Sequence, residues 1–237
     1  MSLVEGKAAV GMRAPTVLTL GGAAFIADPA GALFREADRL LVVADLHLEK
    51  GSSYARRGVL LPPYDTRTTL QRLARLVARY APHAVLALGD SFHDGDAHGR
   101  LDVDDRAAIA DLQRGRDWVW VTGNHDPAVP PGAGGTVAET LVLGGVTFRH
   151  EPGGTEAPEV AAHLHPVAKV RLRGRAVRRR CFVASERRCV LPALGAYAGG
   201  LNVRHGAFQP LFPDGLTAHL LGEERLYSIA GPLLVPD

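Results

Sequence analysis

Four short apolar runs stand out along the first two thirds of the chain, and each one ends in polar residues. They lie in the segments LVVADLHLEK (41–50), AVLALGDSFHD (84–94), DWVWVTGNHD (117–126) and GGVTFRHEP (144–152). Short apolar runs of this kind predict strands that are buried on both faces. Functional sites in open α/β sheets lie beyond the carboxyl ends of such strands. The polar ends of the runs are therefore where we look for chemistry.

Two amphipathic segments between these runs predict helices. The segment DTRTTLQRLARLVARY (65–80) places apolar residues along one face, with Asp65 as its expected N-cap and Ala81-Pro82 as its stop. Its arginines fall mostly off this apolar stripe, so we expect them on the solvated side. A second helix is predicted from Asp102 to Arg114, because Gly115 follows as a C-terminal stop.

The remaining segments predict mainly short strands. Alternation in residues 169–195 favours antiparallel strands with turns at Arg173-Gly174 and Ser185-Glu186. Residues 16–40 also predict short strands, around a turn at 28–31. Because no internal repeat or linker is visible, we expect a single domain over residues 1–237.

Composition narrows the classes of function only a little. The 237 residues carry a net charge of +2, and their hydrophobic and charged fractions are ordinary for a soluble domain. Two cysteines, Cys181 and Cys189, form neither a disulfide framework nor a CxxC zinc motif, and are expected to be small strand residues. No uncharged apolar run approaches the roughly 20 residues of a membrane span. We expect a cytoplasmic enzyme without a membrane partner.

The polar residues near these strand ends have the composition of a metal-binding set. They comprise two carboxylates, one amide and four imidazoles: Asp45, His47, Asp90, Asn124, His150, His163 and His165. Oxygen and nitrogen donors without sulfur suit Mn²⁺, Fe or Zn²⁺ at a catalytic site better than a closed structural zinc. Seven donors are too many for one ion but suit two ions that share a bridging carboxylate, as in two-metal phosphoesterases.

The order of these motifs resembles the calcineurin-like metallophosphoesterases. The chain shows DLH, GDSFH, GNHD, RH and AHLH in that family's order. The stretches EKGSSYARRGVLLPPYDT (49–66), HLHP and LPALGAYAGGL (191–201) are similar to the bacterial DNA-ligase-associated branch, a DNA damage response family of metallophosphoesterases and endonucleases. The resemblance implies an α/β fold, a four-layer sandwich of two facing mixed β-sheets flanked by helices.

The resemblance also implies how the ligands divide between two divalent ions. Asp45, His47 and His165 would hold the first ion, and Asp90 would bridge both. The second ion would be held by Asn124, His150 and His163. Manganese is the expected metal, with iron or zinc as alternatives.

Three further residues receive catalytic roles from the same resemblance. His125 would act as general acid or phosphate clamp, Asp126 would orient its ring, and His93 would face the phosphate or the leaving group. One position departs from the family: Ala162 stands where a glycine is usual, and its methyl group is expected to crowd the turn that presents His163.

Candidate substrate contacts lie in two segments. Tyr54, Arg56, Arg57 and Tyr64 follow the first metal motif and would either contact the substrate or pack a loop. Lys169, Arg171 and Arg173 alternate with apolar residues after His165, so we expect them on one strand face beside the metals. Residues 169–204 hold ten basic residues and one acid. Such a bias is typical either of edge protection or of a surface for a polyanion.

The function implied by the resemblance is phosphodiester hydrolysis at a dinuclear centre. The natural substrate would be single-stranded DNA, cut by a manganese-dependent endonuclease in DNA repair, in functional association with a DNA ligase and helicase. Alternatives are a phosphodiesterase for small molecules such as cyclic nucleotides, and a phosphomonoesterase. A scaffold without catalysis, the remaining alternative, is disfavoured by the complete set of ligands.

Overall fold

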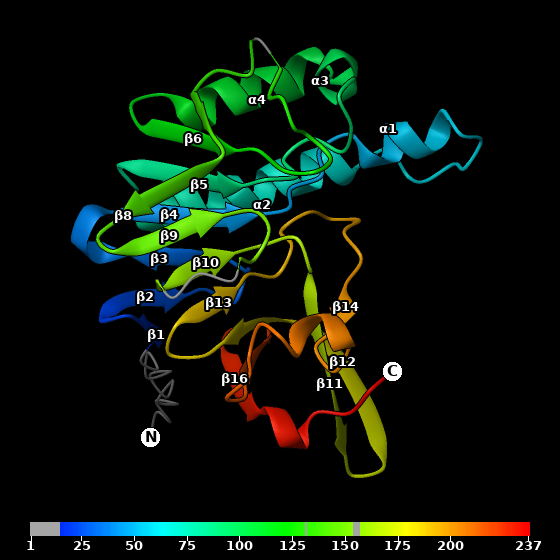
Figure 1. Cartoon of the computed structure of the whole chain (residues 1–237). Helices are drawn as coiled ribbons and strands as arrows, with labels where there is room; N and C mark the ends of the chain where they lie inside the picture. Colours follow the sequence, from blue (N-terminus) through cyan, green and yellow to red (C-terminus); the bar gives the residue numbers. More distant parts are fainter. Residues whose placement is uncertain (1–14, 131, 154–156) are drawn as a thin grey trace, which may run out of the picture.

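The computed structural model describes residues 15–130, 132–153 and 157–237, which form two facing β-sheets (Figure 1). The first sheet has seven strands in sequence order: β1 (Thr16–Leu20), β2 (Ala23–Ala27), β3 (Leu33–Arg35), β4 (Leu40–Ala44), β5 (Ala84–Leu88), β6 (Asp117–Val121) and β7 (Thr136–Ala138). Strands β1 to β4 pair antiparallel, whereas β4 to β7 pair parallel. The four expected apolar runs are therefore strands, three of them adjacent in this sheet.

The second sheet has nine strands and is also mixed. Seven of them follow one path: β14 (Leu201–Asn202), β11 (Pro166–Leu172), β12 (Arg175–Ala184), β13 (Arg188–Val190), β10 (Glu159–Ala161), β9 (Val146–Arg149) and β8 (Thr140–Leu143). Strands β15 (Thr217–Leu221) and β16 (Leu226–Ala230) continue from β12. The β11–β12 hairpin extends away from the two sheets in Figure 1.

Helices are few. The α-helices are α1 (Lys50–Ala55), α2 (Asp65–Tyr80), α3 (Ala97–Arg100) and α4 (Val103–Gln113), and the 3₁₀ helices are η1 (Glu36–Asp38), η2 (Gly206–Phe208) and η3 (Gly231–Leu233). Helices α2 and α4 cover the outer face of the first sheet, and η2 packs with loops on the outer face of the second. The layered α/β sandwich with two mixed sheets confirms the expected fold. No helix in the described ranges has the length and apolarity needed to cross a membrane.

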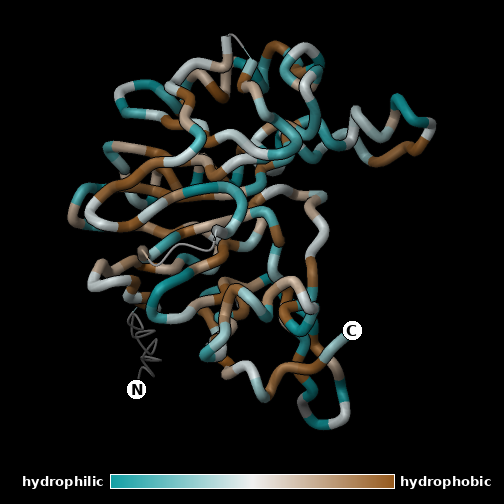
Figure 2. Tube along the Cα trace, viewed as in Figure 1, coloured by the Kyte–Doolittle hydropathy of each residue, from teal (hydrophilic) through white to brown (hydrophobic). Residues whose placement is uncertain are grey.

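Alternation along each strand builds three apolar layers. On β4, Val42 faces the second sheet while Leu41 and Val43 face the helices. On β12, Phe182 faces the first sheet while Cys181 lies on the opposite face. Because successive side chains point to opposite faces, buried strands carry apolar residues at nearly every position. Figure 2 accordingly shows brown, hydrophobic stretches along many of the strands.

The helix over residues 65–80 is confirmed, but its expected N-cap is wrong. The N-cap is Tyr64, and Asp65 is the first helical residue. The carboxylate of Asp65 is buried and accepts a hydrogen bond of 2.9 Å from the backbone N–H of Gly51, so it joins α2 to α1. Two arginines expected in solvent also have partners: Arg72 donates to the Leu194 carbonyl at 3.0 Å and Arg79 pairs with Asp28.

A buried ion pair inside the second sheet generates a stability prediction. Glu159 is fully buried and pairs with Arg188 on the neighbouring strand β13. Arg188→Leu leaves the carboxylate without its cation, so we expect the free energy of unfolding to fall by about 3–5 kcal/mol. Denaturant unfolding measures this loss. Arg187→Leu, at the exposed neighbouring position, should change it by less than about 0.5 kcal/mol; equal losses would contradict the assignment.

Candidate metal centre

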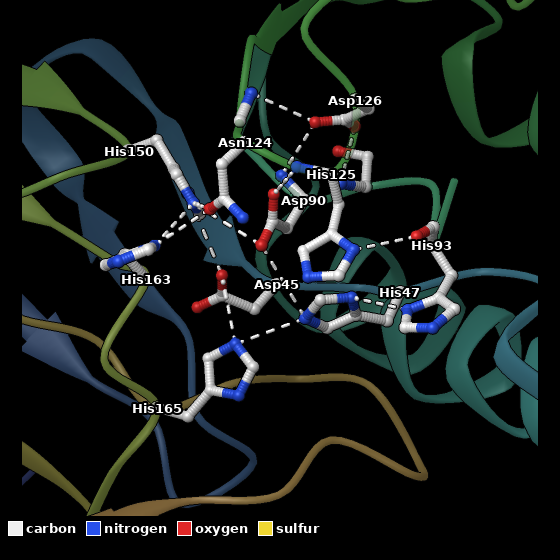
Figure 3. A network of polar contacts seen from close by, with 12 residues as sticks. Asp45, His47, Asp90, His93, Asn124, His125, Asp126, His150, His163 and His165 are labelled. Carbon is white, nitrogen blue, oxygen red and sulfur yellow. Dashed lines mark hydrogen bonds and ion pairs between the residues drawn. The ribbon is translucent and has the colours of Figure 1, made fainter. Parts of the chain in front are cut away.

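The polar residues at the strand ends meet between the two sheets (Figure 3). Asp45 follows β4, Asp90 follows β5, and the GNHD segment (123–126) follows β6. From the second sheet, His150 follows β9, while His163 and the residue two further on precede β11. Parallel neighbours end at the same edge of a sheet, which is why three successive strands deliver their polar residues to one place.

A first group of donors surrounds one position in this cluster. The side chains of Asp45, His47, Asp90 and His165 each offer an atom within 4.8 Å of the others. His165 Nε2 lies 3.1 Å from His47 Nε2 and 3.3 Å from Asp45 Oδ1. Burial, and then the neighbouring His165, lower the pKa of His47 to about 2, so its ring is neutral. Neutral imidazole nitrogens are metal donors.

A second group shares Asp90 with the first. His150 Nε2 lies 3.4 Å from Asp90 Oδ2, and the same carboxylate atom lies 3.9 Å from His47 Nε2. Asn124 Oδ1 is 3.0 Å from His150 Nε2 and 2.9 Å from His163 Nδ1. Asp90 is thus the residue common to both groups, in the arrangement that a bridging ligand requires.

The residues fit a pair of cations on chemical grounds. Both carboxylate oxygens of Asp45 are buried and accept no hydrogen bond within the part of the chain that the structure describes. Buried polar atoms in native proteins are ordinarily satisfied, so such a carboxylate indicates a cation partner. Burial lowers the pKa of His150, but hydrogen bonding and charge from Asp90, together with Asp45, outweigh it and raise the pKa to about 9. A metal ion would replace that proton.

The backbone at the site is held in an uncommon conformation. Five of the seven expected ligands have a left-handed backbone: Asp45 (φ 51°), His47 (φ 43°), Asp90 (φ 46°), His163 (φ 69°) and His165 (φ 44°). Asp and His tolerate this region better than most residues, yet each such residue costs on the order of 1–3 kcal/mol. Strain of this kind concentrates at functional sites, where it aims side chains that a regular strand would separate.

Two glycines next to the ligands are functional positions that the sequence patterns did not single out. A Cβ on Gly89 would lie 2.4 Å from the His150 ring, and one on Gly123 would lie 2.3 Å from both the backbone N and Oδ1 of Asp90. Neither site has room for a larger residue. The sequence signal for these two positions is the glycine that begins each of the GD and GN motifs.

The expected support of His125 by Asp126 is wrong. Asp126 is buried, and its carboxylate accepts four backbone N–H groups, from residues 90, 91, 92 and 123, at 2.7–3.1 Å. Burial raises the pKa of Asp126 to about 6, while these N–H donors oppose the rise. His125 Nδ1 instead contacts the carbonyl oxygen of His93 at 2.8 Å. Asp126 therefore fixes the loop that carries Asp90.

His93 lies behind the first group of donors. Its Nδ1 is 3.3 Å from His47 Nδ1, and its ring stacks on His125 with centroids 5.0 Å apart. The side chain is buried, and burial followed by the charge of Lys50 lowers its pKa to about 4, so the ring is neutral. Its expected contact with the phosphate or leaving group stays a prediction.

Comparison with known proteins identifies the family. The family model for calcineurin-like phosphoesterases matches residues 38–169, more than half of the chain. The chain belongs to the calcineurin-like phosphoesterases. Its structure is similar to that of Pseudomonas putida nuclease MPE, with a TM-score of 0.70 and 30% identity over 90% of this chain and 100% of that one. This match supports the resemblance to the ligase-associated branch.

Two further comparisons add nothing on function. YfcE, a phosphoesterase from E. coli, matches with a TM-score of 0.39 and 14% identity over 81% of this chain and 98% of that one. No curated protein matches the sequence significantly.

A polar network that the sequence did not reveal supports the start of α1 in this phosphoesterase. Glu49, buried and left-handed (φ 65°), accepts hydrogen bonds from the hydroxyl groups of Ser52 at 2.6 Å and Thr66 at 2.9 Å. Arg100 donates to Ser52 at 2.8 Å and holds Asp94 through two further bonds. The network joins the segments that follow the DLH and GDSFH motifs. Nothing in the spacing of these residues predicted it.

The first set of candidate substrate contacts lies on an arm formed by α1 and the following loop (49–64), which projects from the phosphoesterase fold in Figure 1. The Tyr54 ring centroid is 6.0 Å from that of His93. Arg56 is exposed and pairs with Asp96 at 3.0 Å. Arg57 is exposed and close enough to contribute to the low pKa of His93. Tyr64 is 65% exposed at the end of the arm's loop. Their contact with substrate stays a prediction.

The structure contradicts the expected position of the second set. Lys169 and Arg171 lie on β11, and Arg173 lies in the turn after it; β11 runs away from the site as half of the projecting hairpin (Figure 1). At about 3.3 Å per residue, Arg171 lies roughly 20 Å and Arg173 roughly 26 Å from His165. Only Lys169 remains within about 13 Å. The alternating pattern predicted the strand but not its direction.

Ala162 does not crowd the turn as expected. Its side chain is fully buried in the apolar layer between the sheets. Its backbone N–H donates to the His150 carbonyl at 2.9 Å, and its carbonyl accepts from Leu164 at 2.8 Å. The methyl group thus adds to the core beneath the ligands.

The shared carboxylate generates a prediction about metal content. Asp90→Ala should remove both ions, because Asp90 belongs to both groups, whereas His163→Ala should leave the first ion bound. Metal analysis of the purified and dialysed variants measures this difference. His83→Ala, an exposed imidazole outside both groups, is the control and should keep both ions. An Asp90→Ala protein with full metal content would show that Asp90 does not bridge.

Proposed function

We propose that this phosphoesterase is a dinuclear, manganese-dependent phosphodiesterase that cuts single-stranded DNA as an endonuclease. The observation that carries the proposal is the pair of donor groups that share Asp90, each with buried imidazole or carboxylate donors. The likeness to a nuclease supports a nucleic-acid substrate. A role in DNA repair beside a ligase and helicase, in the cytoplasm, belongs to the same proposal and rests on the motif resemblance alone.

The donor set favours Mn²⁺ over Mg²⁺. Four of the seven donors are imidazoles, and Mg²⁺ prefers oxygen ligands and retains its water. Iron and zinc accept the same donors, so the choice of manganese among the three rests on the motif resemblance. When bound, two such ions supply a nucleophile at neutral pH and neutralise charge on the phosphoryl oxygens.

The protein's own residues position the reacting groups and move one proton. Asp45, His47 and His165 would hold one ion, while Asn124 and the imidazoles of residues 150 and 163 would hold the other. His125 is exposed and is fixed through Nδ1 by the His93 carbonyl. The carbonyl accepts the Nδ1–H proton, so Nε2 is the ring atom left free to face the departing oxygen.

The experiment that tests this function uses a substrate without ends. A circular single-stranded DNA is linearised only by an endonuclease, so its cleavage separates the proposal from a phosphodiesterase for cyclic nucleotides and from a phosphomonoesterase. We expect cleavage of the circle with Mn²⁺ and much slower hydrolysis of cyclic nucleotides. An intact circle beside rapid cyclic-nucleotide hydrolysis would favour the small-molecule alternative.

Metal removal should abolish catalysis. Chelation should stop hydrolysis of bis-(p-nitrophenyl) phosphate, and Mn²⁺ should restore the rate better than Mg²⁺ because of the imidazole donors. Initial rates after chelation, dialysis and addition of each metal measure the effect. Full activity in the presence of chelator would contradict the dinuclear centre, whereas inactivity with every metal would support the scaffold alternative.

His125 should separate catalysis from metal binding. His125 also forms a third cluster of possible donors with His47 and His93, but it is absent from both groups that share Asp90, so His125→Ala should keep both ions. The rate should fall by about 10²–10⁴-fold, the range for loss of a general acid. Metal content and kcat of the same preparation test this together. A variant that loses its metal would assign His125 as a ligand instead.

A further inference from the structure

A third group of imidazoles lies beside the two groups that share Asp90. His47, His93 and His125 each offer a ring nitrogen within 4.8 Å of the others (Figure 3). His47 belongs to the first donor group as well, and it turns Nε2 toward that group, where this atom lies 3.1 Å from His165 Nε2. Its other ring nitrogen, Nδ1, lies 3.3 Å from His93 Nδ1. The ring of His47 therefore lies between the first group of donors and His93.

The metal-binding nitrogen of His47 determines which of the two Nδ1 atoms carries the proton. An imidazole that binds a cation through Nε2 uses the lone pair of that atom, so its one ring proton is on Nδ1. His47 must then donate from Nδ1 and His93 Nδ1 must accept, which places the proton of the His93 ring on Nε2. Metal-bound imidazoles ordinarily donate their second N–H to a neighbouring acceptor, and this bond fixes the tautomer and the orientation of the ring.

His150 meets the same requirement in a different way. Its Nε2 faces the second group of donors, at 3.0 Å from Asn124 Oδ1, while its Nδ1 lies 3.0 Å from the Leu88 carbonyl oxygen. A carbonyl oxygen can only accept, so the backbone alone fixes this ring. At His47 an imidazole stands where His150 has a carbonyl group. The orientation of His47 therefore depends on a side chain, which a substitution can change.

The backbone holds the rings of His47 and His93 next to each other. The segments that follow β4 and β5 pair in parallel: Leu48 N–H donates to the Ser91 carbonyl at 2.9 Å, and His93 N–H donates to the Leu48 carbonyl at 3.0 Å. Both imidazole side chains are buried. Buried N–H groups in native proteins are ordinarily hydrogen-bonded, so the Nδ1–H of His47 depends on the acceptor that the protein supplies.

We propose that His93 is a positioning residue for the first ion: its Nδ1 accepts the Nδ1–H of His47 and so directs His47 Nε2 at that ion. The inference rests on the dinuclear centre of the proposed function and is independent of the DNA substrate. The same residue holds His125, whose Nδ1 lies 2.8 Å from the His93 carbonyl oxygen. His93 thus joins a metal ligand, through its side chain, to the proposed general acid, through its backbone.

The test compares two substitutions of similar shape. Asn and Leu both branch at Cγ, but Asn can place an oxygen where His93 carries Nδ1, so His93→Asn keeps an acceptor and His93→Leu removes it. Each is made in the His163→Ala background, which lacks a ligand of the second ion and is expected to bind only the first. Equilibrium dialysis against Mn²⁺, without any substrate, gives the dissociation constant of that ion.

We expect His93→Leu to raise the dissociation constant of the first ion by about 10- to 100-fold, the range for loss of a residue that supports a metal-binding imidazole. His93→Asn should restore most of the affinity. His83→Leu, at an exposed imidazole outside all three groups, is the control and should not change it. Equal losses in the Asn and Leu variants would show that the packing of the ring matters and not its acceptor, and unchanged affinity in both would exclude His93 from metal binding. Either result overturns the proposal.

A second measurement uses the unchanged protein, so it does not depend on how the variants fold. With Zn²⁺ in place of Mn²⁺ and isotope-labelled histidine, nuclear magnetic resonance shows which ring nitrogens carry protons. We expect protons on Nδ1 of His47 and on Nε2 of His93, and a proton on His93 Nδ1 would overturn the proposal. Binding of a third ion among the three imidazoles, with loss of the proton from His47 Nδ1, would overturn it as well.

A failure of the proposed function gives a different result. An unchanged protein that binds no divalent ion would contradict the dinuclear centre, and the role of His93 with it. Metal binding with the expected affinities beside an intact DNA circle would contradict only the DNA substrate. Undiminished metal binding by His93→Leu, in contrast, would remove only the positioning role and leave the endonuclease proposal standing.

Discussion

Two carboxylates buried at the ends of adjacent parallel strands are the constraint on which this structure depends. Asp45 and Asp90 are both almost completely excluded from solvent, and Asp45 accepts no hydrogen bond from the described residues. Buried carboxylates without a positive partner are strongly destabilising. The imidazoles around them, with His150 protonated, offset part of this charge, and two divalent cations would offset the rest. The left-handed backbone at the ligands and the small residues at 89 and 123 follow from bringing so many donors together.

Neither sheet forms this centre alone. The first sheet supplies the two carboxylates, His47 and Asn124, whereas the second supplies the remaining three imidazoles. Between them lies an apolar layer that includes Phe148 and Ala162, each within two residues of a ligand from the second sheet. Close-packed interiors transmit small displacements rather than absorb them. The packing of one sheet on the other therefore sets the distances at the metal centre, and the methyl group of Ala162 contributes to that packing.

Much of the fold and of the donor set could be predicted from the sequence because both depend on patterns within short segments of the chain. Buried parallel strands are continuous apolar runs, and polar residues at their ends have no packing role, so residues such as Asp45 and Asn124 were visible at once. The role of Asp126 was not, because three of the four backbone N–H groups that donate to it belong to a segment some 35 residues away. Asp65 failed as an N-cap for the same reason: a tertiary contact with Gly51 replaced the local one. Alternation along β11 likewise defined a strand without defining where it leads.

The arginines show how position, and not composition, separates a binding surface from ordinary structure. In the sequence, ten basic residues between 169 and 204 form one group. In the structure, Arg188 neutralises a buried glutamate, Arg178 pairs with Asp237, and the residues at the end of the hairpin lie far from the metal centre. A charge already paired in the native state has little left to offer an incoming anion, and a distant charge acts only through a screened field. Arg179 is unpaired among the described residues, but it alternates with Arg178 and Arg180, so its side chain lies on the opposite face of β12 from theirs. A substrate contact needs a cation that is both unpaired and close to the metal donors, so the excess of positive charge in the sequence does not by itself identify one.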